Sequence, residues 1–77
     1  MKINIELMGA LVDYLPASEK GQSVLTLKDE STIANLLSNI KIKRRVSVAV
    51  NGDEEKGLEH VLSDGDEVLI FTVISGG

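Results

Sequence analysis

The sequence predicts an α+β fold in which one main helix covers a mixed sheet of four to five strands. Two observations support this expectation. Segments that alternate with the two-residue period of strands lie on both sides of one segment that has a helical period. Residues 68–74 are apolar on both faces, which indicates a strand in the middle of the sheet. With 77 residues, we expect a single domain that spans residues 1–77.

The N-terminal third of the chain predicts two strands that are separated by a loop. Residues 2–8 alternate cleanly between apolar and polar side chains, as in a strand with one buried face. Residues 9–21 contain Gly and Pro at several positions and predict mostly loop, with one helical turn before Pro16. Residues 23–28 predict a second, short strand.

The helix is predicted over residues 32–40. Ser31 or Thr32 can cap it by accepting a hydrogen bond from a free backbone N–H. Its apolar residues recur at the spacing of a single buried stripe, formed by Ile33, Leu36, Leu37 and Ile40.

The C-terminal half predicts two further strands. Residues 46–50 are mostly β-branched and are followed by Asn51-Gly52, a strong turn signal. Residues 53–63 look irregular, a second turn is centred on Gly65, and the last strand is expected from about residue 67 to 74. If the first and last strands are neighbours, the helix lies across them in a β-grasp arrangement.

Composition excludes several kinds of site. The chain has no cysteine and only His60 as an imidazole, so a metal site or a cysteine or histidine dyad is not expected. The net charge of −4 argues against nucleic acid, and no apolar run is long enough to span a membrane. No secretory signal is present, so a cytoplasmic protein is expected.

Two charged clusters have ordinary explanations. The basic run "KIKRR", residues 41–45, is best explained as the solvated end of the helix; a phosphate patch and a dock for an acidic partner are the alternatives. The acids at residues 53–55 and 64–67 lack the spacing of a calcium loop, so turn chemistry is favoured. We expect His60 to lie in a loop or at the surface.

The C-terminal residues, Ser75, Gly76 and Gly77, follow the last strand without a spacer. Two residues without Cβ can pass through a constriction that excludes larger ones. The terminal carboxylate is ionised at neutral pH, and activation by ATP would turn it into a mixed anhydride that sulfur or an amine can attack. All other catalytic groups would then be supplied by a partner, so we expect a carrier rather than an enzyme.

The segments "VAVNG", "LSDGDEVLIF" and "SGG", in this order, resemble the ubiquitin-like sulfur carriers of the MoaD/ThiS family. This resemblance implies a β-grasp fold and adenylation of Gly77, the one predicted reactive residue, by an enzyme related to ubiquitin-activating proteins. The adenylate is then converted to a thiocarboxylate. No tightly bound cofactor is implied, because the activating partner uses the ATP.

The resemblance also implies partners and a docking surface. The sulfur acceptor would be an enzyme such as the large subunit of molybdopterin synthase. Side chains of Phe71, Val73 and Ile74 that point outward, together with Ser75 and Gly76, would contact the partners. At least one of the first three is expected in the core.

Two features bear on the pathway. The segment 9–21 makes the chain longer than typical thiamine-type carriers and favours the molybdopterin branch. Carriers of that branch often have Pro-Pro before the terminus, whereas Thr72 and Val73 stand here. A thiamine-pathway or other sulfur carrier, a modifier joined to lysines through Gly77, and a plain interaction module remain alternatives.

Overall fold

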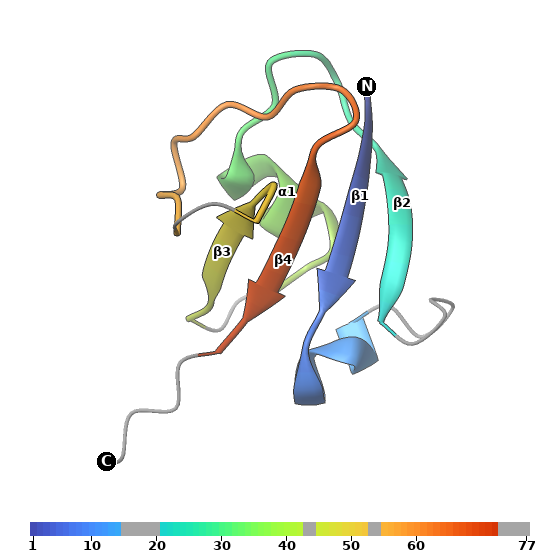
Figure 1. Cartoon of the computed structure of the whole chain (residues 1–77), viewed down its shortest axis with the longest axis vertical. Coiled ribbons are helices and arrows are strands. Elements are labelled where there is room, and N and C mark those ends of the chain that lie inside the picture. The colour runs from blue at the N-terminus through green and yellow to red at the C-terminus, as the bar shows by residue number, and fades with distance from the viewer. Residues whose placement is uncertain (15–20, 43–44, 53–54, 73–77) are drawn as a thin grey trace.

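The computed structural model describes residues 1–14, 21–42, 45–52 and 55–72. In these residues, two strands precede the α-helix and two follow it, and one short 3-10 helix lies between the first two strands (Figure 1). In chain order they are β1 (Lys2–Leu7), η1 (Gly9–Tyr14), β2 (Gln22–Thr26), α1 (Ile33–Asn39), β3 (Ser47–Val50) and β4 (Glu67–Phe71).

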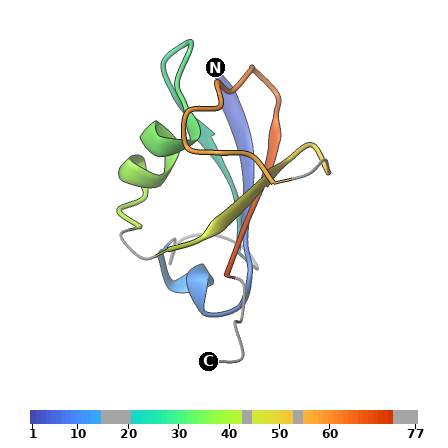
Figure 2. The same ribbon diagram turned by 90° about the vertical axis from the view of Figure 1, so that its left-hand side faces the viewer.

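The four strands form one mixed sheet in the order β2-β1-β4-β3. The first and last strands, β1 and β4, are parallel neighbours, and each pairs on its other side with an antiparallel strand. Turned by 90°, the molecule shows α1 on one side of the sheet (Figure 2). The predicted α+β fold, the β-grasp arrangement and the central position of the last strand are therefore confirmed.

The core lies between α1 and the sheet. One face of β1 and of β4 is buried, and the stripe of α1 packs against it. The most completely enclosed side chains are Ile3, Leu7, Leu11, Ile33, Leu36 and Ile70. Among the described residues, no polar or charged side chain is buried. A chain of this size has only a small core, so stability depends on filling it with aliphatic side chains.

The helix begins at Thr32, one of the two predicted caps. The Thr32 side chain accepts a hydrogen bond from the N–H of Asn35, and the Asn35 side chain accepts one from the N–H of Thr32. This reciprocal pair satisfies backbone donors that the first helical turn leaves free. Ser31 instead donates to the carbonyl of Lys28, at 2.6 Å.

The observed strand ends differ from the predicted ones, because a strand stops where its neighbours no longer offer backbone groups for pairing. In β4, Ile70 pairs with the last residue of β1, and Phe71 pairs with the first residue of β3. Thr72 therefore has no ladder partner and lies outside the strand, and residues 73–74 are outside the described part. The predicted loop over 9–21 contains the longer turn of η1 instead of a single helical turn.

The irregular segment between β3 and β4 is fixed to the helix by its backbone. The carbonyls of Leu58 and His60 accept hydrogen bonds from the N–H groups of Ala34 and Ile33, at 3.0 and 3.1 Å. These are donors of the first helical turn that have no partner within the helix. The prediction of irregular structure was right, and His60 lies half-buried in this loop.

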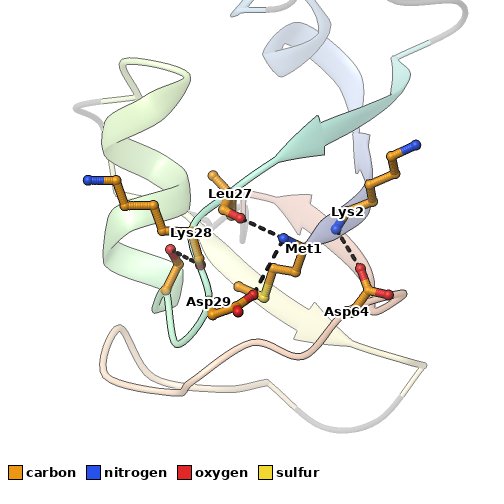
Figure 3. A network of polar contacts seen from close by, with 7 residues as sticks. Met1, Lys2, Leu27, Lys28, Asp29 and Asp64 are labelled. Carbon is orange, nitrogen blue, oxygen red and sulfur yellow. Dashed lines mark hydrogen bonds and ion pairs between the residues drawn. The ribbon is translucent and has the colours of Figure 1, made fainter.

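The N-terminus is joined to two connections (Figure 3). The ammonium group of Met1 donates to the carbonyl of Leu27 at 2.8 Å and lies 3.6 Å from the carboxylate of Asp29. The N–H of Lys2 donates to Asp64 at 2.6 Å. These contacts join the start of β1 to the connection between β2 and α1 and to the segment that precedes β4. None of the helices in the described part of the chain has the length and apolar character needed to cross a bilayer.

Candidate functional site

The candidate site is the C-terminal segment and the strand that leads into it. The predicted residues Val73, Ile74, Ser75, Gly76 and Gly77 lie outside the described part of the chain. The structure does describe the strand before them. Because β4 is hydrogen-bonded to β1 on one side and to β3 on the other, it is held along both edges. A strand in this position is a rigid base for any segment that follows it.

The side chain of Phe71 lies on the face of the sheet that α1 does not cover. Val68 and Ile70 are buried on the helix side, so the alternate residues Leu69 and Phe71 point to the opposite, open face. Both are half-buried. Phe71 therefore faces outward from the helix side of the sheet. Its role in docking, like the roles of Val73 and Ile74, stays a prediction.

The open face of the sheet combines apolar and acidic side chains. Cross-strand partners share a face, so Leu69 lies beside Glu6 of β1 and Ala49 of β3. Val24 of β2 is 55% exposed on the same face. A shallow depression of about 770 Å³ lies over β2, β1 and β4 on this side. This open face surrounds the strand that leads into the C-terminal segment.

The two turns that carry the most specific sequence signals meet at the start of β4. The side chain of Asn51 accepts a hydrogen bond from the N–H of Glu67 at 2.8 Å and donates to the carboxylate of Asp66 at 3.0 Å. Asp66 also accepts from the N–H of Ser63 at 2.8 Å. The sequence predicts two separate turns, because a pairing between residues sixteen positions apart leaves no local pattern.

This hydrogen-bonded unit explains the acids of the second turn. Asp64 and Asp66 each accept hydrogen bonds from backbone N–H groups, which agrees with the turn interpretation. Gly65 has the positive φ that the turn requires, +84°. Within the described residues, no group of three or more His, Cys, Asp or Glu side chains is placed to hold a metal ion. The hydrogen bonds of this unit join the turn at Asn51 to the start of β4.

A helix across a mixed sheet with parallel first and last strands defines the class of ubiquitin-like β-grasp proteins. The ThiS family model matches residues 5–77, and the chain belongs to the ThiS family. The resemblance noted in the sequence is thereby confirmed at the level of the family. The comparison with curated proteins gave no match.

Solved structures from Haloferax volcanii share the fold. The crystal structure of SAMP1 has a TM-score of 0.74 at 16% identity, with 100% of both chains covered. The crystal structure of small archaeal modifier protein 1 has a TM-score of 0.72 at 13% identity, covering 95% of this chain and 98% of that one. The solution structure of the HVO 2177 protein has a TM-score of 0.79 at 20% identity, covering 100% and 87%. At these identities the likeness establishes the fold.

Proposed function

We propose that the chain is a sulfur carrier whose Gly77 carboxyl group is adenylated and then converted to a thiocarboxylate. Membership of the ThiS family and the ubiquitin-like fold together support a sulfur carrier or a ubiquitin-like modifier. The observation that carries the proposal is the position of β4. A strand that is fixed on both edges ends at Phe71, and only three residues separate it from Ser75, Gly76 and Gly77, so a partner can bind the fold and receive the C-terminus.

The chemistry requires only one group from this chain. A carboxylate oxygen of Gly77 attacks the α-phosphorus of ATP, a P–O bond forms, and pyrophosphate leaves. A sulfur atom at the oxidation level of sulfide then attacks the carbonyl carbon, a C–S bond forms, and AMP leaves with the bridging oxygen. Splitting a difficult substitution into two displacements makes a poor electrophile reactive.

The partners follow from this chemistry. An adenylyltransferase related to ubiquitin-activating enzymes would bind ATP and activate Gly77, so this chain itself needs no tightly bound cofactor. A second enzyme would accept the sulfur. We propose molybdopterin synthesis as the pathway, with the large subunit of molybdopterin synthase as the model for the acceptor, because the segment 9–21 resembles that branch. The proposed location is the cytoplasm.

The open face of the sheet is the proposed docking surface for the acceptor. Phe71 and Leu69 present half-buried apolar area next to the C-terminal segment. Aromatic side chains at the centre of an interface often contribute most of its affinity. A partner that covers Phe71 would then be placed to enclose Val73 to Gly77 in its active site.

A second candidate is a protein modifier joined to lysines through Gly77. The same adenylate that reacts with sulfur also reacts with an amine, and one of the fold's neighbours bears the name small archaeal modifier protein 1. The two candidates share the activation step and differ only in the nucleophile that follows it.

The test is incubation of the protein with ATP and its cognate activating enzyme, with or without a sulfide source. Pyrophosphate exchange and an AMP adduct on Gly77 are expected without sulfide, and an oxygen-to-sulfur exchange with it. Isopeptide-linked products would favour the modifier. If no adenylate forms, the carrier proposal is wrong.

A further inference from the structure

The basic run of residues 41–45 begins just past the C-cap of α1, Ile40. Half of the eight Lys and Arg residues of this acidic chain stand in these five positions. The last turn of α1 itself contains no basic residue, so any role in offsetting the helix dipole would rest on cations beyond the C-cap. Lys41 follows the cap residue Ile40, with a positive φ of 62°, and both Lys41 and Arg45 are exposed. Lys43 and Arg44 lie outside the described part.

These two described cations border an open groove of about 980 Å³ on the helix side of the molecule. The groove lies between α1, the connection from α1 to β3, and the irregular segment after β3. Its apolar lining comes from all three elements: Leu37, Ile42, Val46 and Leu58. Lys41 and Arg45, together with Ala34 and Ser38 of α1, complete the lining. In the described part of the chain, neither cation forms an ion pair with an acidic side chain.

Leu58 is the unusual member of this lining. Its side chain is 56% exposed, although its carbonyl is fixed by a hydrogen bond from the N–H of Ala34. The backbone therefore holds a large apolar side chain at the surface, beside a groove, with two cations at its border. An apolar floor with a basic border is complementary to a segment that carries apolar side chains flanked by Asp or Glu.

The groove also lies near the end of β4, the strand that precedes the C-terminal segment in the sequence. Val46 directly precedes Ser47, and Ser47 is the cross-strand partner of Phe71, the last residue of β4. One Cα–Cα step and one strand spacing separate Val46 from Phe71, so the groove begins within about 10 Å of the end of β4. Figure 1 shows the start of β3 and the end of β4 at the same end of the sheet.

From this juxtaposition we infer that the groove binds an acidic amphipathic segment of the enzyme that activates Gly77. The inference rests on the proposed function, since it names a contact of the same activation complex. The groove is lined in part by α1, which lies on the opposite side of the sheet from the open face (Figure 2), so the activating enzyme would bind beside the end of β4 from the helix side. The open face would remain free for the sulfur acceptor.

The test compares groove variants with matched controls in two assays with the cognate activating enzyme. The groove variants are the double reversal Lys41→Glu and Arg45→Glu, and Leu58→Ser. Control variants are Lys28→Glu, another exposed cation, and Val61→Ser, whose side chain is 52% exposed but outside the groove. The assays are calorimetric binding at two salt concentrations and the KM and kcat of pyrophosphate exchange.

The double reversal is expected to raise both Kd and KM about tenfold at low salt, with less effect at high salt, because the lost contacts are charged. Leu58→Ser is expected to raise them about fivefold at either salt concentration. The value of kcat and the melting temperature should not change, and both controls should behave as the unmodified protein.

Adenylation of the unmodified protein with unchanged KM and Kd in the groove variants overturns the groove inference alone. Binding that depends on the groove without any adenylation overturns the proposed function alone. Absence of both binding and adenylation overturns both. Tight binding of a single-stranded RNA oligonucleotide that the double reversal abolishes would assign the cations to phosphate contacts and also refute the inference.

Discussion

Replacing Asn51 with alanine is expected to destabilise the fold while leaving the activation chemistry intact. Asn51 has a φ of +56°, a conformation that alanine adopts only at a cost of about 1 kcal/mol. Its side chain also makes two exposed hydrogen bonds, to the N–H of Glu67 and to the carboxylate of Asp66. Each contributes about 0.5–1 kcal/mol, so the free energy of unfolding should fall by about 2–3 kcal/mol.

This loss is large for a domain of 77 residues, whose total stability is expected to be roughly 4–12 kcal/mol. The melting temperature should fall by roughly 8–24 °C. Asn51→Gly removes the same side-chain hydrogen bonds without the strain, so it should cost about 1 kcal/mol less than Asn51→Ala. The difference between the two variants measures the strain of the positive φ separately.

The assay is urea unfolding followed by circular dichroism, with the exposed Asn39→Ala at the end of α1 as the matched control. That control should change stability by less than about 0.5 kcal/mol. A folded Asn51→Ala protein should be activated as well as the unmodified one, because the turn and the C-terminal segment adjoin opposite ends of β4 (Figure 1). The structural role of the turn would be refuted if Asn51→Ala and Asn39→Ala had the same free energy of unfolding. It would also be refuted if the Asn51→Ala protein were stable but could not be activated.

Three further predictions follow from the same structure. Gly21 has a φ of +78°, and a Cβ added there would lie 2.5 Å from the carbonyl oxygen of Leu7, whereas a Cβ added at Gly65, with a φ of +84°, meets open space. Calorimetry should therefore show that Gly65→Ala lowers the free energy of unfolding by about 1 kcal/mol and that Gly21→Ala lowers it clearly more. Equal losses in the two variants would contradict the close approach at Gly21. Thr32→Ala should cost about 1 kcal/mol in urea unfolding by removing the helix cap, and no change would mean that the capping pair contributes nothing. Deleting Gly77 should abolish pyrophosphate exchange without changing the melting temperature, and an unfolded deletion variant would show that the C-terminal segment is structural.

The buried faces and the central position of the last strand were predictable because burial leaves a periodic trace in the sequence. The alternation in residues 2–8 and the stripe from Ile33 to Ile40 identify buried faces regardless of what covers them. The apolar character of residues 68–74 placed the last strand in the middle of the sheet for the same reason. Leu69 and Phe71 are apolar on the open face, so part of this signal marks a half-buried surface and not the core.

Contacts between distant residues were not predictable in this way. Asn51 and Asp66 each have a local explanation as turn residues, and only the fold brings them together. The same holds for the groove, where Leu58 meets Lys41 and Arg45 although no sequence pattern links them. The ends of β4 depend on where β1 and β3 end, which is a property of the register and not of the strand's own residues.

The most direct test of the account is the mass of the C-terminal peptide of the protein isolated from its native cells. The account predicts a population in which one carboxyl oxygen of Gly77 has been replaced by sulfur, and its loss when the activating enzyme is removed. A Gly77 that always carries an ordinary carboxylate, in cells where the activating enzyme is present, would contradict the proposal that this chain carries sulfur.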